Sequence, residues 1–527
     1  MDQVQQTSPE RTRPRSAKRW LLTVGIAAAI LIAGAFLLVA KWPFTREKIT
    51  SALQERTERR VLIGAFRQTF FPPGCVVEDV RFLRHNHPDR TPIITIKKLI
   101  VEGSYGRLIT LSKRISLVHV VGMRVTVPPR GPGPDGEKHS VMPLTHSKAG
   151  RSVSIEYIVA DGTVLDFMPR ESWKQPYQLE IQRLEMSNVG SGGPLGYHAI
   201  LHNTEPPSEI HSTGKFGPWN PDDPASTPVS GSYLMDHAEL GVFKGISGTL
   251  NSKGTFSGAL DRVAVKGTAV VPDFHVTRSR HTLPLSTEFD AVVDGTDGDT
   301  ILGNVKSSVL RSMVFSKGSV AGKEGQKGKT TALDMWVQNG RIQDLLLLFV
   351  KAPHAAMSGN INLRAKVEVP PDSRPFLDKL RMDGDFGIGA GKFANTANQG
   401  AINKISESAR GETKQEQAVD PQTVLSDLKG HAVVRNGIAT LSHVSFRVAG
   451  AVAAVTGTYN LINEQIDLHG QLETNGKLSD ATSGFKSLML KVVNPFFKKK
   501  HGVKVIPFKI TGTYGHPAVA LDFGHKK

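Results

Sequence analysis

The sequence has very little cysteine: Cys75 is the only one among 527 residues. An intramolecular disulfide is therefore excluded, and the fold has to hold together without covalent cross-links. The surrounding segment, PPGCVVEDV, is typical of the start of a strand, where a thiol is usually a small buried hydrophobic group. We do not expect Cys75 to act as a nucleophile.

The motifs of the common enzyme classes are also missing. There is no G-x-S-x-G elbow, and the run GKEGQKGKT at 322–330 has five residues between its outer glycines where a P-loop has four. We interpret that run as a basic turn. The aspartates of 290–299 lack the ligand spacing of an EF-hand and are more typical of turns. Several histidines occur without an H-E-x-x-H or C-x-x-C motif or a convergent carboxylate pair: His85, His87, His119, His139 and His146. We predict that the chain is not an enzyme and has neither a cofactor nor a metal site.

Long apolar runs are scarce, and the one that exists lies at 20–40. WLLTVGIAAAILIAGAFLLVA carries no charge and has about the length of 20 residues that a helix needs to cross a bilayer. The next most apolar run, LLLLFV at 345–350, is too short for this and predicts core or a groove wall. We predict a single transmembrane anchor at 20–41, with these anchoring side chains: Trp20, Leu31, Leu38 and Trp42.

The flanks of this stretch set its orientation. Five Lys and Arg residues lie in the tail before it, which predicts a cytoplasmic N-terminus and an exported body. A cleaved signal peptide is the alternative, but its apolar core would be shorter, and Leu38-Val39-Ala40 is a poor cleavage site. A retained anchor is therefore the preferred interpretation.

Acidic residues are outnumbered, so the chain has a net charge of +17. An excess of this size favours an acidic partner surface, either anionic lipid head groups or nucleic acid. No helix-turn-helix spacing, Cys/His finger or RNP-like strand occurs, so nucleic acid is not an expected partner.

Beyond the anchor we predict a mainly β chain with a few short helices. Residues 43–60 form a short amphipathic helix that would lie against a membrane or cap a sheet. From residue 61 onward, short segments alternate apolar and polar residues between Gly and Pro, which indicates half-buried strands. From residue 246 the spacing becomes regular, as in a long antiparallel meander. Two proline-rich patches, 128–151 and 205–230, predict irregular structure.

The predicted boundaries follow these changes in composition. They are a basic tail at 1–19, the anchor at 20–41, an N-terminal α/β segment at 43–127, a Pro/Gly-rich linker at 128–151, a β-groove body at 152–405, a polar loop at 406–422 and a C-terminal β region at 423–527.

The C-terminal region contains two predicted hairpins. The first turns at Asn436-Gly437, the dipeptide that best supplies a type I′ turn. The second, AVAAVTGTYNL with EQIDLHGQLET, has one largely apolar face in a chain with too few helices to cover it. A curved sheet would cover this face with itself or leave it as a groove for lipid tails. The candidate groove residues are Val452, Val455, Tyr459, Leu461, Ile466 and Leu468.

An amphipathic helix is predicted at 482–497, followed by a run of lysines. This pattern suits an interfacial segment on an anionic membrane, and a helix that plugs the groove end is the alternative. The candidate membrane-surface residues are Phe485, Leu488, Phe496, Phe497, Lys498, Lys499 and Lys500.

Three regions together carry a family resemblance. They are the anchor followed by PFTREKITSALQERTERRVLIGAFR and PPGCVVEDVRF; VQNGRIQDLLLLF with Pro370-Pro371 downstream; and 428–522, with KGHAVVRNGIATLSHVSF, VTGTYNLINEQIDLHG and VIPFKITGTYGHPAVALDF, which holds Gly512, Thr513 and Pro517. In this order the regions resemble the AsmA-like family of bacterial envelope proteins, relatives of TamB and of bridge-like lipid transfer proteins. The resemblance implies an inner-membrane protein whose β-rich body lies in the periplasm, curls into an apolar groove and serves outer-membrane lipid homeostasis.

Two functions from different classes follow. The first is a non-enzymatic carrier that binds phospholipid acyl chains in a β-groove and takes part in lipid transport and outer-membrane biogenesis. The second is a periplasmic scaffold factor that modulates the insertion of outer-membrane proteins through exposed strand edges. Because strands stack about 4.8 Å apart, some 20 to 25 of them would give a groove on the order of 100 Å long.

Overall fold

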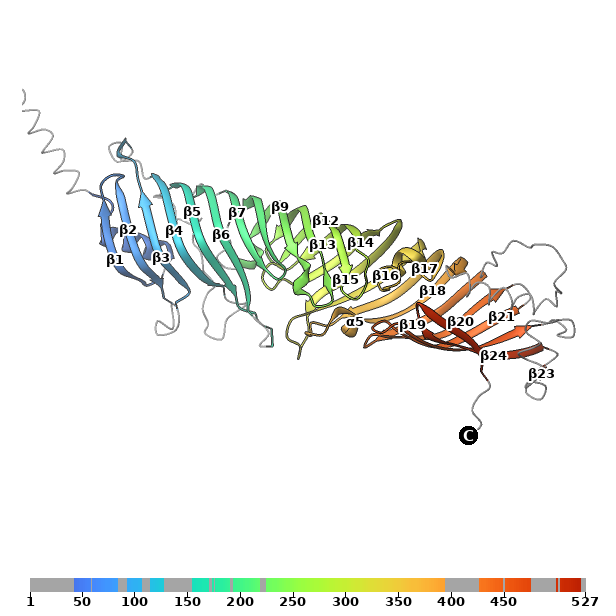
Figure 1. Cartoon of the computed structure of the whole chain (residues 1–527). Coiled ribbons are helices and arrows are strands. Elements are labelled where there is room, and N and C mark those ends of the chain that lie inside the picture. Colours follow the sequence, from blue (N-terminus) through green and yellow to red (C-terminus); the bar gives the residue numbers. More distant parts are fainter. Residues whose placement is uncertain are drawn as a thin grey trace, which may run out of the picture.

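The chain forms one long, curved sheet of the half-barrel type with few helices (Figure 1). The prediction of a mainly β fold is confirmed. The computed structural model describes residues 42–57, 59–83, 92–106, 114–127, 154–169, 173–174, 176–189, 193–218, 224–393, 426–448, 451–474, 499–500 and 503–522. Within these residues no helix has both the length and the apolar character needed to cross a bilayer. The predicted anchor at 20–41 lies outside them.

The first half of the sheet follows helix α2 (Arg46–Thr57), which is the helix expected within 43–60. Its strands are β1 (Val61–Thr69), β2 (Gly74–Phe82), β3 (Ile94–Glu102), β4 (Arg114–Val127), β5 (Ser154–Phe167), β6 (Tyr177–Val189), β7 (Leu195–Thr204), β8 (Pro207–Phe216), β9 (Pro228–Glu239), β10 (Ile246–Ser247), β11 (Thr249–Ala259) and β12 (Arg262–Val276). Two single 3₁₀ turns, η1 (Pro224–Ser226) and η2 (Leu240–Val242), lie in its connections.

The second half continues without a change of layer. Its strands are β13 (Leu283–Val293), β14 (Thr300–Val309), β15 (Ser312–Gly322), β16 (Lys329–Arg341), β17 (Met357–Val369), β18 (Arg381–Phe393), β19 (Ser426–Arg435), β20 (Ile438–Val448), β21 (Ala451–Asn460), β22 (Gln465–Thr474), β23 (Lys499–Lys500), β24 (Val503–Thr513) and β25 (His516–Leu521). Two short helices, α4 (Ile342–Leu346) and α5 (Phe376–Lys379), connect strands.

Sequence neighbours pair along the whole ladder. All pairs are antiparallel except β4 with β5, which are parallel. A parallel pair needs a connection of a dozen residues or more, because the chain must return along the full strand. The predicted linker at 128–151 lies in that connection. The short strands β10 and β23 pair on the sides of β12 and β24, so that β9 pairs with β11 and β22 with β24.

Bulges curve the sheet. An extra residue in one strand of an antiparallel pair bends that strand and increases its twist. The ladder has such register shifts at Asp290/Ala291, Leu302/Val305, Val337/Gly340, Ser358/Asn360 and Leu441/Val444.

The apolar side chains point to the concave face of the sheet. Near each end of the sheet, residues from helices cover this face. At the N-terminal end Ile49 and Leu53 of α2 pack on a cluster that includes Val77 and Val80. Toward the C-terminal end the core cluster of β16–β24 receives Leu345 and Leu346. The run 345–350 therefore packs as core, as the sequence predicted.

The prediction of irregular structure at 205–230 is wrong. Residues 205–230 contain strand β8 and the start of β9, and β7 just before them was also missed. Two of the prolines that suggested irregular structure, Pro207 and Pro228, stand at the first positions of strands, where the missing N–H does not interrupt the ladder.

Candidate functional site

One row of register partners crosses the concave face from the first strand to the last. The row takes one residue from every strand except the short β10 and β23, and each partner is paired directly with the next. All its side chains except the first are apolar, aromatic or glycine. The row is Gln68, Cys75, Val101, Val118, Ile158, Met186, Tyr197, Gly214, Gly231, Phe256, Val265, Ala291, Leu302, Gly318, Leu333, Val367, Met382, Val434, Ala439, Tyr459, Ile466, Gly512 and Pro517. We call it the apolar row.

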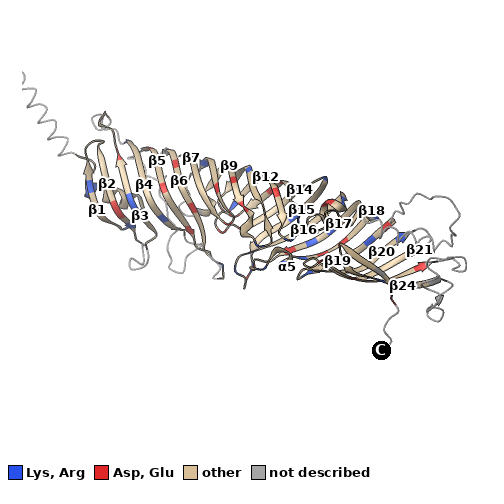
Figure 2. Ribbon diagram, in the orientation of Figure 1, with Lys and Arg blue, Asp and Glu red and all other residues tan. Residues whose placement is uncertain are grey.

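The convex face carries the charges. Because side chains alternate between the two faces of a strand, the neighbours of the apolar row point outward. Lys266 and Asp290 lie 3.9 Å apart on adjacent strands, and Lys306 and Glu288 lie 3.8 Å apart. Such pairs are exposed and contribute little to stability. Figure 2 shows Lys, Arg, Asp and Glu distributed along the whole length of the sheet.

Aromatic rings lie close over glycines on the concave face. A Cβ at Gly267 would come within 2.9 Å of the Phe289 ring and 2.8 Å of the Tyr233 hydroxyl. At Gly470 it would come within 2.4 Å of the Phe508 ring. Glycine is therefore needed at these positions for the rings to lie against the backbone.

The middle of the concave face is less covered than its ends. In the part of the chain that the structure describes, no residue of β9–β14 belongs to the three buried apolar clusters. Members of the apolar row here, such as Phe256, Val265 and Leu302, are half-buried. The apolar surface is thus continuous, while α2 and α4 contribute helical residues to the clusters at its two ends.

The strand connections form two rims. Since the pairing is antiparallel from β5 onward, alternate connections lie at opposite edges of the sheet. We call them the α4 rim and the α5 rim after the helix in each. The α4 rim holds the connections β5–β6, β9–β11, β12–β13 and β16–β17, and the α5 rim holds β13–β14, β15–β16, β17–β18, β21–β22 and β24–β25.

Within the part of the chain that the structure describes, the two rims touch at three places, and the first contact is ionic. Lys174, on the α4 rim, lies 2.5 Å from Asp297 and 3.1 Å from Asp299, both on the α5 rim. Lys329 approaches Asp299 at 3.2 Å and donates to the carbonyl oxygen of Asp297 at 2.8 Å. The Trp173 ring lies 3.4 Å from the position that a Cβ on Gly322 would take. Two ammonium groups and two carboxylates thus balance in a half-buried cluster.

The environment keeps the charges of this cluster in place. Burial alone would lower the pKa of Lys174, but its hydrogen bonds to Asp297 and Asp299 outweigh burial and raise the pKa. Burial likewise opposes ionisation of Asp299, yet the backbone N–H of Gly322 and the two ammonium groups hold its pKa below the ordinary value. Both groups therefore stay charged at neutral pH.

The other two rim contacts use the backbone. The N–H of Phe376 donates to the carbonyl oxygen of Lys244 at 2.7 Å. Farther along, the N–H of Lys351 donates to Glu464 at 2.8 Å, and the N–H of Ala356 donates to the Tyr514 hydroxyl. Each contact joins the α4 rim to the α5 rim of strands several places later in the ladder.

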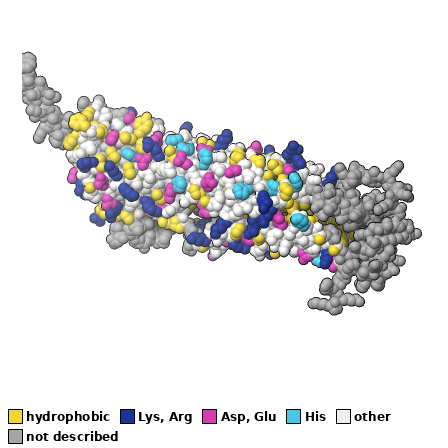
Figure 3. Space-filling view, viewed as in Figure 1, with side chains coloured by type: hydrophobic (Ala, Val, Ile, Leu, Met, Phe, Trp, Pro, Cys, Tyr) yellow, Lys and Arg dark blue, Asp and Glu magenta, His cyan; other side chains and the backbone are white. Residues whose placement is uncertain are grey.

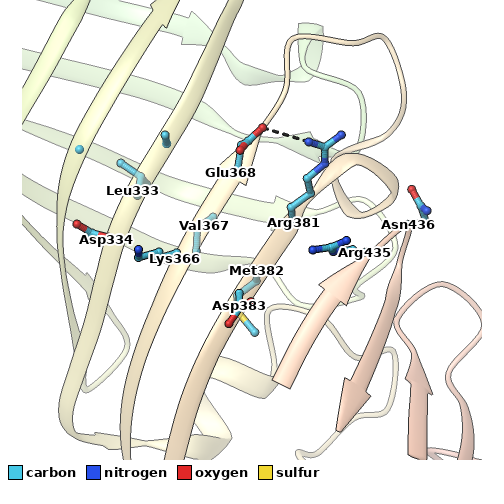
Figure 4. A pocket seen from close by; sticks show the side chains of 12 residues that line it. Leu333, Asp334, Lys366, Val367, Glu368, Arg381, Met382, Asp383, Arg435 and Asn436 are labelled. Atoms are coloured by element: carbon cyan, nitrogen blue, oxygen red, sulfur yellow. Dashed lines mark hydrogen bonds and ion pairs between the residues drawn. The ribbon is translucent and has the colours of Figure 1, made fainter. Parts of the chain in front are cut away.

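A cavity of about 770 Å³ lies where β15–β19 approach the α5 rim (Figure 4). Its lining combines four members of the apolar row with charged side chains, among them Lys366, Arg381 and Arg435. Arg381 is paired with Glu368 at 3.2 Å. The full lining is Gly318, Ala332, Leu333, Asp334, Lys366, Val367, Glu368, Arg381, Met382, Asp383, Arg435 and Asn436.

The structure brings four of the six candidate groove residues together. Val455, Tyr459, Ile466 and Leu468 share the concave face. Val452 was misplaced: it lies three residues from Val455 and so points to the convex face, between Arg447 and Glu473, with 45% of its surface exposed. Leu461 lies in the turn between β21 and β22 rather than on a strand.

The candidate membrane residues are mostly outside the described part of the chain. Trp20, Leu31, Leu38, Phe485, Leu488, Phe496, Phe497 and Lys498 all lie there. Trp42 is buried in the N-terminal core, with its ring centroid 5.9 Å from that of Phe44. Lys499 and Lys500 form β23, paired with Lys504 and Val503.

The residues considered for enzyme chemistry in the sequence lie in the core, in a turn or in ion pairs. Cys75 is fully buried in the apolar row, and burial raises the pKa of its thiol to about 12. Residues 323–328 form the turn between β15 and β16, and Asp297 and Asp299 belong to the ionic rim contact. The His119 ring pairs with Asp161 at 2.7 Å. Among the described residues, no group of His, Cys, Asp and Glu is arranged to hold a metal ion.

The chain matches no family model, no curated protein and no solved structure.

Proposed function

We propose that this chain is a membrane-anchored, non-enzymatic lipid carrier that holds acyl chains in an apolar groove formed by the concave face. In this proposal the N-terminus is cytoplasmic, and the sheet lies in the periplasm of a bacterial envelope. There it takes part in phospholipid transport and outer-membrane biogenesis. The observation that carries the proposal is the apolar row, which reaches from β1 to β24 and β25 without a charged side chain.

The length of the row suits a path for lipid tails. At about 4.8 Å per strand the row measures roughly 100 Å before twist is allowed for. Each methylene taken out of water contributes roughly 0.8 kcal/mol. Over β9–β14, where the row lies outside the buried clusters, neighbouring positions are similarly apolar. A tail there gains nearly the same free energy at each position and can move between them without entering water.

The half-buried middle of the concave face supports a carrier over a scaffold. A concave face filled throughout by its own side chains would leave no surface for a ligand. Here Phe256, Val265 and Leu302 keep part of their apolar surface accessible. An accessible apolar surface of this extent is typical of a binding site.

The cavity at β15–β19 adds cationic groups beside the apolar row, near the α5 rim. Leu333, Val367 and Met382 are members of the apolar row, while Arg381 and Arg435 contribute guanidinium groups to the same lining (Figure 4). Guanidinium groups bind phosphate well, because their donors match its oxygens. Arg381 and Arg435 adjoin members of the apolar row along their strands and so point to the convex face. There they suit an anionic group near the α5 rim, not an acyl chain on the concave face.

The decisive test places a charge on either face of one strand. Val265 belongs to the apolar row, and its neighbour Ala264 is exposed on the convex face. The full chain is purified from its own membranes, and its bound phospholipid is quantified by native mass spectrometry and lipid extraction. For Val265→Asp we expect phospholipid per protein to fall by about tenfold or more, since desolvating a carboxylate costs several kcal/mol.

The control is Ala264→Asp, which adds the same charge one residue away and should retain the lipid of the unmodified chain. Circular dichroism shows whether both variants keep the sheet. Equal lipid content in the two folded variants, or no lipid in the unmodified chain, would contradict the proposal.

A further inference from the structure

The loop between β1 and β2 exposes two adjacent aromatic side chains. Phe71 has 89% of its surface exposed and Phe70 has 45%. Single exposed apolar residues are common, but adjacent aromatics followed by Pro72-Pro73 give a protruding apolar tip.

Neighbouring residues hold this loop in place. The Tyr105 hydroxyl donates to the carbonyl oxygen of Phe70 at 2.5 Å, and the Tyr105 ring centroid lies 5.8 Å from that of Phe71. The Trp42 and Phe70 centroids are 5.1 Å apart. On the far side of the loop, the N–H of Gly103 donates to the carbonyl oxygen of Pro73 at 2.8 Å. Phe71 is therefore exposed on a fixed loop.

The aromatic cluster of Trp42, Phe70, Phe71 and Tyr105 lies next to the apolar run at 20–40, which points to a lipid bilayer as its partner. Trp42 is separated by Lys41 alone from the uncharged apolar run at 20–40. Two peptide units span at most about 7 Å, so the run ends close to the aromatic cluster whatever its own conformation. Figure 3 shows hydrophobic side chains gathered at this N-terminal end of the molecule.

The loop also adjoins the start of the apolar row. Gln68 and Cys75, the first two members, pair with one another across the hairpin that Phe70 and Phe71 close. A surface that receives these two rings would therefore lie at the beginning of the row.

We propose that the Phe70–Phe71 loop inserts into the lipid bilayer and holds the first strands of the sheet at the membrane surface. This inference rests on the membrane attachment in the proposed function, and it adds a second contact that fixes the orientation of the sheet. Aromatic rings favour the interface between water and hydrocarbon, where they bury apolar surface without a full crossing.

The test measures the depth of residue 71 in a membrane. In the full chain, Phe71→Cys is labelled with an environment-sensitive NBD fluorophore; the native Cys75 is fully buried and should not react. The labelled protein is reconstituted into vesicles of phosphatidylethanolamine and phosphatidylglycerol. We expect blue-shifted emission and at least about twofold quenching by lipids brominated on their acyl chains.

The matched control is Ile301→Cys, because Ile301 is an apolar residue with 63% exposure on β14, far along the ladder. Its label should be quenched by aqueous iodide and not by brominated lipid. Equal iodide quenching at both positions would overturn the inference. The outcome is independent of lipid content in the groove: a label at position 71 that is quenched in the bilayer, together with a lipid-free row, would keep the membrane contact and reject the carrier.

Discussion

Single residues determine how closely the two rims approach, and Gly245 is the clearest case. Its φ is +96°, a conformation that costs other residues roughly 1–3 kcal/mol. A Cβ there would also lie 2.5 Å from the backbone nitrogen of Phe376, the residue that donates across the rims to Lys244. The contact between these backbones therefore needs a residue without a side chain.

We predict that Gly245→Val breaks this rim contact and lowers the free energy of unfolding by about 1–3 kcal/mol. Thermal unfolding followed by circular dichroism measures the change. Gly241→Val is the control, since a Cβ at this nearby glycine meets nothing within 4 Å. Similar unfolding midpoints for the two variants would show that the contact does not contribute to stability.

Residue alternation was predictable from the sequence only where one face is uniformly apolar. Val455, Tyr459, Ile466 and Leu468 follow the period of two and share the concave face. Val452 is equally apolar but lies an odd number of residues from Val455, so hydrophobicity alone misplaced it. The alternation with a period of two therefore predicts the face of the sheet better than the hydrophobicity of a single residue does.

At the scale of elements, the connection between β16 and β17 is held by one buried carboxylate. Asp344 on α4 accepts from the N–H of Arg311 and from the Ser312 hydroxyl, each at 3.0 Å. Beyond α4, Ser279 donates to the carbonyl oxygen of Leu347 at 2.9 Å. These bonds fix α4 so that Leu345 can pack against the concave face.

We predict that Asp344→Ala lowers the free energy of unfolding by about 1–3 kcal/mol, because a buried N–H and a hydroxyl lose their acceptor. Limited proteolysis should also cut within 342–356 sooner. The control is Asp334→Ala on β16, where the carboxylate is exposed. If both variants resist protease equally, the carboxylate does not hold the connection.

Elements could be predicted where the local sequence signal agrees with the pairing of the strands. The turn at Asn436-Gly437 could be predicted, because a type I′ turn requires positive φ at both central residues and Asn-Gly adopts it readily. The observed φ values are 51° and 74°. Strand β8 could not, because Pro206 and Pro207 dominate its local signal although its register with β7 is regular. The tertiary ladder overrides the local preference there.

At the scale of the whole molecule, contacts between the two rims bridge the open side of the curved sheet at three places among the described residues. Lys174 and Asp297 are 123 positions apart in the sequence, and no local pattern links them. Their contact arises only from the curvature and stagger of the strands between them. The curved sheet could thus be predicted from the sequence, but its bridges could not.

We predict that a zero-length carbodiimide joins the Lys174 amine to the carboxylate of Asp297 or Asp299 in the native full chain, because these groups are 2.5 and 3.1 Å apart. Peptide mass spectrometry identifies the cross-link. Lys174→Arg should abolish it, since a guanidinium does not form the amide, while a link between Lys329 and Asp299 should persist. Recovery of the second link without the first would show that the rims do not meet in solution.

The pairing of each strand with its neighbour in sequence also sets an order of assembly. A chain delivered from its N-terminus can add every new strand to an edge that already exists, so each step closes only a short loop and growth resembles that of a repeat array. The parallel pairing of β4 with β5 is the slow step early in this order, because it needs the long return connection. Each bridge forms only after the strands between its two ends: Lys174 has to wait for eight further strands before Asp297 is in place. Growth of the sheet and closure of its rims are therefore separate events in folding.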